Sequence, residues 1–463
     1  MQISKKDINK ILILFLISHI VIWTFVPYVF NINLPLDTIE ALAYGNDLQL
    51  GYDKYPPLFP LIIEFVFQIF GNQDWAFYFL SQIFITSSFI IIFKFSCDFF
   101  QNQIFGLISV LLLEGIFFHN FTTPELNPIL GQMPFLTLTV FYCWKAFNQN
   151  DNLSWFLFGV FAALSVLIFY LSFYLLLSLA LFFIYNIIKN KNFNFKYLIA
   201  LVSFFIILTP HLIWILNNNP TTINYALFRS FGDPLTGLPG PKIIDHIFYP
   251  LIFLTKQILI VVPAFFIFFL IIRKFKIKIN YKDKKLLFLI SITILPLILM
   301  FFTSIILGAR IRTMWMTSFY LYTGVFFIYI FKSEINLKKI KNFFFAFLFL
   351  FILVPVLYSI DSYMHKDKRT DYPGKKISQL VQSKWDSNFS SKIEIVVGSG
   401  WVNGWYAQNL SYHLASRPKW KQKLEKYSDK GTVWIKGFNE IEKCSGILYK
   451  IQNMNDVCMF KNK

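Results

Sequence analysis

The chain has 463 residues, of which 56% are hydrophobic and only 15% are charged. A soluble domain usually has about 25% charged residues, so this composition excludes an ordinary water-soluble enzyme. The 58 phenylalanines exclude a disordered chain, which is poor in apolar residues, and four cysteines are too few for a disulfide-rich scaffold. The composition predicts a polytopic helical membrane protein, and its net charge of +18 needs an explanation.

Apolar segments long enough to cross a membrane recur along residues 1–360. A helix needs about 20 mostly apolar residues to cross the hydrocarbon core of a bilayer. The stretch 153–188 is too long for one crossing and predicts a hairpin of two short spans, whereas 58–70 is too short and predicts an interfacial helix. The hairpin and nine further spans give eleven predicted crossings, the nine being 11–30, 75–96, 104–119, 128–147, 197–216, 246–272, 286–307, 314–331 and 343–360.

The distribution of Lys and Arg tests this count, because positive charge collects in short cytoplasmic loops. With the N-terminus inside, the cytoplasmic stretches hold 19 basic residues and the short outer loops hold five. A single crossing at 153–188 would instead put the basic cluster 273–285 outside. The charges therefore favour the hairpin and place the tail, 361–463, outside the cytoplasmic membrane. Because topology explains the basic clusters, no nucleic-acid partner is expected.

The first outer loop, residues 31–57, is long and acidic. Its residues Asp37, Glu40 and Tyr44 are spaced so that they share one face of a helix, which is predicted to end near Gly51. A partly desolvated carboxylate at a membrane surface can act as a general base or bind a metal ion. A solvated acidic helix explains the same residues, and the sequence leaves both interpretations open.

The second outer loop, residues 119–127, reads HNFTTPELN. A tight connection between two spans needs only turn-forming residues, so the polar groups here, among them Glu125 and Asn127, exceed that requirement. We expect this loop to complete a site that begins at Asp37. An ordinary turn is the alternative interpretation.

Three basic residues break the charge pattern on the outer side. Lys256 interrupts the span 246–272, and an ionisable residue at membrane depth is a functional hypothesis by default, although its long stem can also carry the charge to the surface. Arg310 and Arg312 lie just ahead of the span 314–331. Since the Arg fork matches phosphate oxygens in bidentate geometry, they predict either a lipid-phosphate substrate or contact with anionic headgroups.

The tail is polar and carries 18 basic against ten acidic residues, a surplus that suggests contact with anionic lipid or glycan. Its pattern predicts a small α/β domain, with strands at 393–398, 432–436 and 447–451 and a helix at 402–414. Cys444 and Cys458 lie on the side of the membrane where disulfides form. They either pair or serve as two small core residues, and the sequence leaves this open.

Motifs of soluble enzymes are absent from the sequence. It contains no phosphate-binding Gly-rich loop, no G-x-S-x-G and no Cys/His metal spacing. The acidic outer loop therefore remains the best candidate for chemistry.

The run P-L-D-T-I-E-A-L-A-Y-G-N-D-L-Q-L-G-Y-D-K-Y-P-P-L at 35–58 resembles the first outer loop of membrane-embedded GT-C glycosyltransferases. It is most similar to the branch that contains the lipid A aminoarabinose transferases and the protein mannosyltransferases. The shared pattern is an acidic residue after the first span, then Gly-Tyr, then Pro-Pro-Leu opening an apolar helix. Further motifs follow in the family's order, namely T-P-E-L-N at 123–127, T-P-H-L-I-W at 209–214, the outer loop 217–245 and R-P at 417–418.

This resemblance implies a GT-C-like, all-α polytopic membrane domain over residues 1–360, with about eleven transmembrane helices and an outer loop at 31–74. A small extracytoplasmic α/β domain would follow at 361–463. The implied location is a bacterial inner membrane, with the N-terminus cytoplasmic and the C-terminal domain periplasmic.

The resemblance also implies an inverting glycosyltransferase whose donor is a sugar on a polyprenyl phosphate. The acceptor would be lipid A, another envelope glycan or a protein. Asp37 and Glu40 would be the catalytic carboxylates, with Asp37 accepting the proton of the acceptor. The donor phosphate would be bound by Lys54, Arg310, Arg312 and Lys256. The acceptor would be oriented by Glu125, Asn127 and Tyr55. A divalent cation shared by Glu40 and Glu125 is left open, and no other cofactor is expected.

Two rival functions fit the same composition. A transporter or flippase of a lipid-linked sugar would move its substrate without forming a glycosidic bond. An O-antigen-ligase type of transferase would use a diphosphate donor. The sequence names neither the sugar nor the acceptor.

Overall fold

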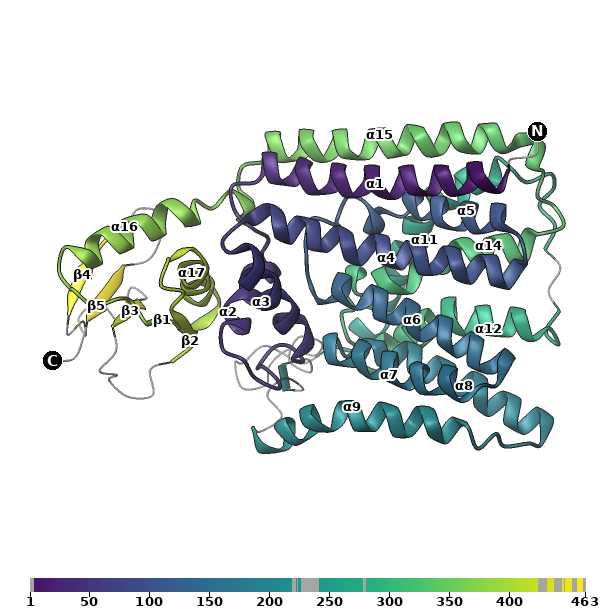
Figure 1. Cartoon of the computed structure of the whole chain (residues 1–463), viewed down its shortest axis with the longest axis horizontal. Coiled ribbons are helices and arrows are strands. Elements are labelled where there is room, and N and C mark those ends of the chain that lie inside the picture. Colours follow the sequence, from purple (N-terminus) through teal and green to yellow (C-terminus); the bar gives the residue numbers. More distant parts are fainter. Residues whose placement is uncertain are drawn as a thin grey trace.

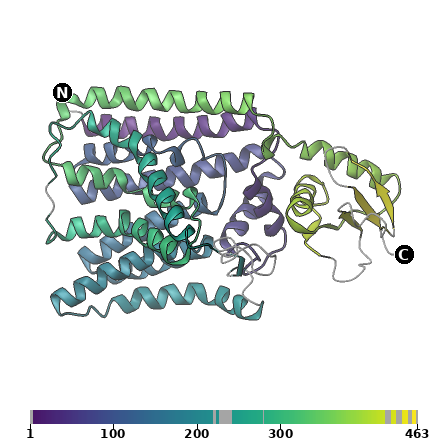
Figure 2. The same cartoon turned by 180° about the vertical axis from the view of Figure 1, so that it is seen from behind.

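The computed structural model describes residues 4–218, 222, 224–225, 241–277, 280–423, 431–436, 444, 446–451 and 456–460. A bundle of roughly parallel and antiparallel helices forms most of the molecule, and a small α/β unit lies beyond one end of it (Figures 1 and 2). Helices α2 (Leu36–Gly45) and α3 (Leu58–Phe70) lie between the bundle and this unit. The mostly helical polytopic fold with a small C-terminal sheet agrees with the sequence prediction.

The bundle contains these helices: α1 (Lys5–Phe30), α4 (Asp74–Phe100), α5 (Gln103–Leu111) with the 3-10 helices η1 (Leu112–Gly115) and η2 (Phe117–His119), α6 (Pro128–Gln149), α7 (Asn152–Ile168), α8 (Ser172–Asn190), α9 (Tyr197–Asn217), α11 (Asp245–Phe269), α12 (Lys284–Thr293), α13 (Leu295–Leu307), the 3-10 helix η3 (Thr313–Tyr320), α14 (Thr323–Phe331) and α15 (Ile340–Met364).

Each predicted span falls on helical structure. Within the described ranges, six helices are long and apolar enough to cross a membrane, or eight if the bent pairs α12–α13 and η3–α14 each count as one span. The pairs are bent by 43° and 57°. The protein is therefore a multi-pass membrane protein, while the count of eleven crossings stays a prediction.

The stretch 153–188 forms two helices, α7 and α8, as predicted. The chain breaks at Phe169, whose extended backbone ends α7. Asn194 Nδ2 donates a hydrogen bond to Asn150 Oδ1 at 2.6 Å, so the start of α7 and the end of α8 lie together. The turn between them therefore lies at the opposite end of the bundle.

The basic loops gather at the end of the bundle that is far from the α/β unit. There, Lys285 Nζ donates to the carbonyl oxygen of Phe99 at 2.8 Å, and the amide of Arg273 donates to the carbonyl oxygen of Glu334 at 2.9 Å. The N-terminus lies at this same end (Figure 1). The prediction that the N-terminus and all basic loops lie on one side of the membrane requires them to share one end of the bundle, as they do here.

The helix of the first outer loop is shorter than predicted. The sequence placed its end near Gly51, but α2 ends at Gly45. A Cβ atom at Gly45 would lie 2.5 Å from the carbonyl oxygen of Pro60, so this glycine allows α2 to pack directly on α3. After α2 the chain folds back, so that Lys54 and Tyr55 contact Glu40 of this helix.

The α/β unit contains a five-stranded sheet in the order β2-β1-β3-β5-β4. Strand β1 pairs in parallel with β2 and β3, whereas β5 is antiparallel to β3 and β4. The bounds are α16 (Gly374–Asp386), β1 (Ile395–Gly398), α17 (Gly400–His413), β2 (Lys419–Lys421), β3 (Thr432–Ile435), β4 (Ile447–Tyr449) and β5 (Val457–Phe460).

The three predicted strands correspond to β1, β3 and β4, and the predicted helix corresponds to α17. The sequence missed β2 and β5, which are only three and four residues long. Cys444 and Cys458 form a disulfide that ties the start of β4 to its partner β5. The pairing that the sequence left open is therefore present.

The α/β unit is fixed to the first outer loop by buried polar contacts. Arg417 Nη2 donates to Glu64 Oε2 at 2.5 Å, and the Arg417 guanidinium lies 3.8 Å from the centroid of the Phe67 ring. Tyr412 donates to Asp74 at 2.6 Å. Because Arg417 and Glu64 are both largely buried, the loss of either side chain would leave the other as a buried charge without its counter-charge.

Replacing Arg417 by Met is expected to destabilise the docked α/β unit by about 3–5 kcal/mol, because a buried carboxylate at Glu64 would lose its partner. Thermal unfolding and limited proteolysis of the purified full chain measure this. The matched control is Lys419→Met, which breaks the half-exposed pair with Asp47 and should change stability by less than about 1 kcal/mol. Equal effects of the two substitutions would contradict the prediction.

The same interface should respond to pH through His413. Burial, with a smaller contribution from the nearby Lys375, lowers the pKa of His413 from 6.5 to about 4, and its Nε2 lies 3.0 Å from Asn33 Oδ1. As the pH falls from 6.5 to 4, the unfolded chain therefore binds a proton that the folded chain excludes, so stability should fall. Between pH 6.5 and 5, His413→Gln should flatten the melting-temperature profile, and a profile as steep as that of the wild type would refute this role.

Candidate active site

Two carboxylates of α2 and two residues of the segment that follows it meet at the outer end of the bundle. Asp37 and Glu40 are one helical turn apart on α2, and the amide of Tyr52 donates to the carbonyl of Tyr55 at 3.0 Å to form a turn. This turn brings Lys54 Nζ into contact with Glu40 Oε2 and to 3.4 Å from Asp37 Oδ1. The acidic helix is therefore not simply solvated, because its charges are paired within the loop.

Tyr55 completes this cluster from the buried side. Its hydroxyl group donates to Glu40 Oε2 at 2.7 Å and lies 3.3 Å from Asp37 Oδ1. Burial, followed by the charges of Asp37 and Glu40, raises the pKa of Tyr55 well above its usual value, so it stays a neutral donor. The predicted acceptor-orienting residue Tyr55 thus contacts the carboxylates directly.

Lys54 keeps its positive charge in this environment. Burial favours the neutral amine, but the charges of Glu40 and Asp37 outweigh it, and the pKa of Lys54 is raised. The structure therefore brings Lys54 to the acids, where the sequence predicted a role in binding phosphate.

The motif T-P-H-L-I-W supports the first outer loop from α9. A Cβ atom at Gly51 would lie 2.3 Å from the Trp214 ring, so only glycine allows this close approach. His211 Nδ1 lies 2.7 Å from the carbonyl oxygen of Leu50. These contacts join the Gly-Tyr segment of the first outer loop to the distant motif at 209–214.

The second outer loop also joins the site, as predicted. Thr38 on α2 donates a buried hydrogen bond to the carbonyl oxygen of Leu126 at 2.9 Å. Asn127 caps α6, because its Oδ1 accepts from the amides of Ile129 and Leu130 at 3.0 and 3.1 Å. Asn127 therefore has a clear structural role beside its position in the cavity wall.

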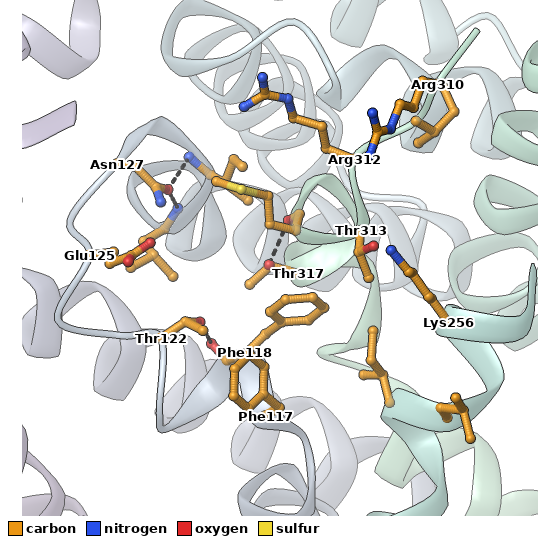
Figure 3. A pocket seen from close by; sticks show the side chains of 16 residues that line it. Phe117, Phe118, Thr122, Glu125, Asn127, Lys256, Arg310, Arg312, Thr313 and Thr317 are labelled. Atoms are coloured by element: carbon orange, nitrogen blue, oxygen red, sulfur yellow. Dashed lines mark hydrogen bonds between the residues drawn. The ribbon is translucent and has the colours of Figure 1, made fainter. Parts of the chain in front are cut away.

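A cavity of about 790 Å³, here called the large cavity, collects most of the remaining predicted site residues. Lys256, Arg310 and Arg312 lie along one side of it, and Glu125 and Asn127 lie on the other (Figure 3). Phe117 and Phe118 also line it. Charged residues of the outer side thus meet in one cavity, although they come from three separate segments: α11, the loop before η3 and the second outer loop.

Two smaller cavities adjoin the acidic cluster. The narrow cavity, about 160 Å³, is lined by Asp37, Lys54, Tyr55 and the turn of the α7–α8 hairpin. The outer cavity, about 470 Å³, is lined by Asp37, Lys54 and Glu125. Arg312 lines all three cavities, so it stands where they meet.

Glu125 has an altered acidity in this setting. Although its side chain reaches open cavity space, the surrounding protein desolvates the carboxyl group and raises its pKa, and the charge of Asp37 adds to this effect. Lys368 acts in the opposite direction. Glu40, by contrast, is buried behind Lys54 and Tyr55 and lines none of the three cavities.

Sequence reasoning missed the contribution of the tail to this site. The outer cavity, which Asp37 lines, is also lined by four residues of the tail, namely Lys368, Arg369, Thr370 and Trp401. The only signal in the sequence was the tail's surplus of positive charge. Of the predicted outer loop 217–245, residues 219–221, 223 and 226–240 lie outside the described residues.

No group of three His, Cys, Asp or Glu side chains that could hold a metal ion occurs in the part of the chain that the structure describes. The acids of the site instead contact Lys54 and Tyr55.

Comparisons with known proteins agree with the family that the sequence motifs indicated. Residues 54–214 match the family model described as dolichyl-phosphate-mannose-protein mannosyltransferase. This range runs from Lys54 through the second outer loop and the hairpin to Trp214. No curated protein sequence matches the chain.

Two crystal structures of ArnT from Cupriavidus metallidurans share the fold. The apo structure is 8% identical, with a TM-score of 0.61 over 97% of this chain and 98% of ArnT. The structure bound to undecaprenyl phosphate is 9% identical, with a TM-score of 0.60 over 96% and 97% of the two chains. The chain thus resembles this mannosyltransferase family over residues 54–214 and shares the fold of ArnT over nearly its whole length, which supports membership of the GT-C superfamily.

Proposed function

We propose that this protein transfers a sugar from a polyprenyl-phosphate carrier to an acceptor on the outer side of the membrane. The observation that carries the proposal is the position of Arg312 at the meeting point of three cavities, two of which also contain Asp37 and Lys54. A cation that can hold the donor phosphate thus lies beside a carboxylate that can accept a proton. Transfer of a sugar from a phosphate needs both groups in one place.

The large cavity suits the phosphate end of the donor. Arg310, Arg312 and Lys256 can form charge-assisted hydrogen bonds with its oxygens, and their side chains are exposed to the cavity. Undecaprenyl phosphate is the ligand of one structure of ArnT, which shares this fold. These features support a polyprenyl-phosphate donor.

An apolar cavity of about 500 Å³ suits the carrier lipid. It lies between α11 and α13, with Phe253, Val261 and Phe301 in its walls. Lys256 of the large cavity is on the same helix, α11. A hydrocarbon chain placed here would be shielded from water while its phosphate faced the cations.

The reaction that we propose is a displacement at the anomeric carbon. The acceptor oxygen forms the new bond to this carbon as the bond from the carbon to the phosphate oxygen breaks. The phosphate leaves with the electron pair, and Arg312, Arg310 and Lys256 stabilise its charge. Asp37 accepts the proton of the acceptor. Attack opposite the leaving phosphate inverts the anomeric centre.

Glu40 and Tyr55 fit a positioning role in this scheme. Glu40 holds Lys54 and Tyr55 through its buried carboxylate, and these two groups surround Asp37. Lys54 and Tyr55 would keep Asp37 oriented toward the acceptor and would neutralise part of its charge. We therefore revise the sequence-based proposal of a catalytic role for Glu40.

The fold also supports the proposed setting. The basic loops and the N-terminus lie at one end of the bundle, and the site and the α/β unit lie at the other (Figure 1). By the distribution of positive charge, the first end faces the cytoplasm. The site would then open on the periplasmic side of a bacterial inner membrane.

The test is a transfer assay with the purified full chain in lipid nanodiscs. Undecaprenyl-phosphate sugars, pentose and hexose in turn, are supplied with envelope lipid extract, and released undecaprenyl phosphate is measured by mass spectrometry. The proposal expects release of the monophosphate together with a glycosylated acceptor. Release of a diphosphate lipid, or movement of the intact donor across the bilayer without bond cleavage, would overturn it in favour of a ligase or a flippase.

A further inference from the structure

We propose that a cavity at the far end of the bundle from the candidate active site binds a phospholipid headgroup that carries an amine beside its phosphate, as phosphatidylethanolamine does. This cavity, here called the inner cavity, has a volume of about 530 Å³. It lies at the end that holds the basic loops and the N-terminus (Figure 1), which faces the cytoplasm in the proposed topology. None of its residues lines a cavity of the candidate active site, so this site is separate from the transferase reaction.

The inner cavity lies where the hydrocarbon core of the bilayer meets the headgroups. Its aromatic residues fall in the last turns of the predicted spans 75–96 and 128–147, whereas most of its polar residues follow these spans or precede the span 286–307. Aromatic rings are typical of this boundary. A lipid can therefore keep its acyl chains in the bilayer while its headgroup enters the cavity, which is lined by Phe95, Asp98, Gln101, Phe141, Trp144, Lys145, Asn148, Gln149 and Lys285.

Two lysines of the inner cavity supply the positive charge for the phosphate. Lys145 lies on α6 and Lys285 lies near the start of α12. Within the described ranges neither forms an ion pair, and Lys285 Nζ uses one donor for the carbonyl oxygen of Phe99. An ammonium group forms charge-assisted hydrogen bonds with phosphate oxygens, and basic pockets between transmembrane helices on the cytoplasmic side bind lipid headgroups.

Asp98 favours a zwitterionic headgroup over a purely anionic one. It is exposed near the end of α4 and lines the same cavity. In the part of the chain that the structure describes, no lysine or arginine pairs with it. Its carboxylate would repel an anionic headgroup, but it can accept hydrogen bonds from the primary ammonium group of phosphoethanolamine. The lysines and Asp98 come from three helices, so the cavity offers both signs of charge on separate walls.

The walls of the inner cavity are held in place by contacts within the protein. The ring of Trp144 packs on that of Phe288, with their centroids 4.8 Å apart. Asn148 Nδ2 donates to the carbonyl oxygen of Trp144 at 2.8 Å, and Gln101 Nε2 donates to the carbonyl oxygen of Asp98 at 2.8 Å. A preformed cavity needs little ordering when the headgroup binds.

The experiment titrates the delipidated full chain in detergent with single phospholipids and measures dissociation constants by native mass spectrometry. The probes are phosphatidylethanolamine, phosphatidylglycerol, which lacks the amine, and phosphatidylcholine, whose quaternary ammonium group has no N–H donor. The variants are Lys145→Gln, Lys285→Gln and Asp98→Asn. The matched controls are Lys189→Gln and Glu334→Gln, because these residues lie at the same end of the bundle and do not line the inner cavity.

We expect the wild type to bind phosphatidylethanolamine about fivefold or more tightly than either other lipid, since only its amine can donate to the carboxylate. Lys145→Gln and Lys285→Gln should each weaken this binding about tenfold, because each loses a charge-assisted hydrogen bond. Asp98→Asn should abolish the preference over phosphatidylglycerol, and both controls should bind as the wild type does. Equal binding of these two lipids by the wild type, an unchanged preference in Asp98→Asn, or equal losses in Lys145→Gln and Lys189→Gln would overturn the proposal.

Glycerophosphoethanolamine identifies the source of the headgroup, because it carries the same charges without acyl chains. We expect it to displace the lipid only at large excess, and a soluble compound that binds as tightly as the lipid would overturn the assignment to a membrane lipid. Melting temperatures without added lipid show whether the variants are folded. Lys145→Arg keeps the charge and should bind phosphatidylethanolamine as the wild type does, whereas a loss as large as that of Lys145→Gln would contradict a role for the charge.

Discussion

Replacing Asp37 by Asn is expected to lower kcat for sugar transfer by about 10²–10⁴-fold, the usual contribution of a general base. The amide keeps the size of the carboxylate and can still accept from Tyr55, whose hydroxyl group lies 3.3 Å away, but it cannot take a proton. Binding of undecaprenyl phosphate should be unchanged. Initial rates of monophosphate release at saturating donor measure the effect.

Asp53→Asn is the control for this prediction. Asp53 lies in the same loop, one residue before Lys54, and is exposed to solvent. The same loss of charge outside the cavities should leave kcat within about twofold. A fully active Asp37→Asn variant would refute the proposed base.

Replacing Arg312 by Ala is expected to lower kcat by about 10²–10³-fold, because removing one preorganised donor to a developing charge typically has an effect of this size. Arg312 lines all three cavities, so in the proposed reaction both the donor phosphate and the acceptor would lie within its reach. Arg312→Lys should recover part of the rate, since it keeps the charge but loses the bidentate fork. The Kd for undecaprenyl phosphate should rise in parallel.

The control for Arg312 is Arg273→Ala. Arg273 lies in a basic loop at the opposite end of the bundle, where its backbone amide bonds to Glu334. Loss of this charge should leave the rate and the Kd unchanged. Similar losses in both variants would mean that Arg312 acts through general electrostatics and not as a ligand of the phosphate.

Much of the fold could be predicted from the sequence because a bilayer imposes simple rules. The apolar runs and the one-sided basic loops predicted the helices and the hairpin at 153–188, since backbone groups in hydrocarbon must be satisfied within a helix. The close packing of α2 on α3 at Gly45 could not be predicted, because it involves Pro60, a residue on another helix.

The candidate site was predictable only in part. Asp37, Glu40, Lys54 and Tyr55 are close in sequence, and one helical turn followed by one tight turn is enough to bring them together. Lys256 and Arg312 could be singled out as charges in unusual places, but their shared cavity depends on how α11 and η3 pack. The contribution of Trp401 had no local signal at all.

The sequence by itself determined the class of this protein, since composition, span length and loop charge leave few solutions other than a multi-pass helical bundle. The first-loop motif added a resemblance to GT-C glycosyltransferases. The tertiary structure decided which charges act together. Lys54 pairs with acids of its own loop, Arg312 joins three cavities, and the tail closes the site through a buried ion pair between Arg417 and Glu64. The contact of Arg417 with Glu64 and the cavities that Arg312 shares with Asp37 join residues hundreds of positions apart. Periodicity and propensity are local properties that carry no information about such contacts.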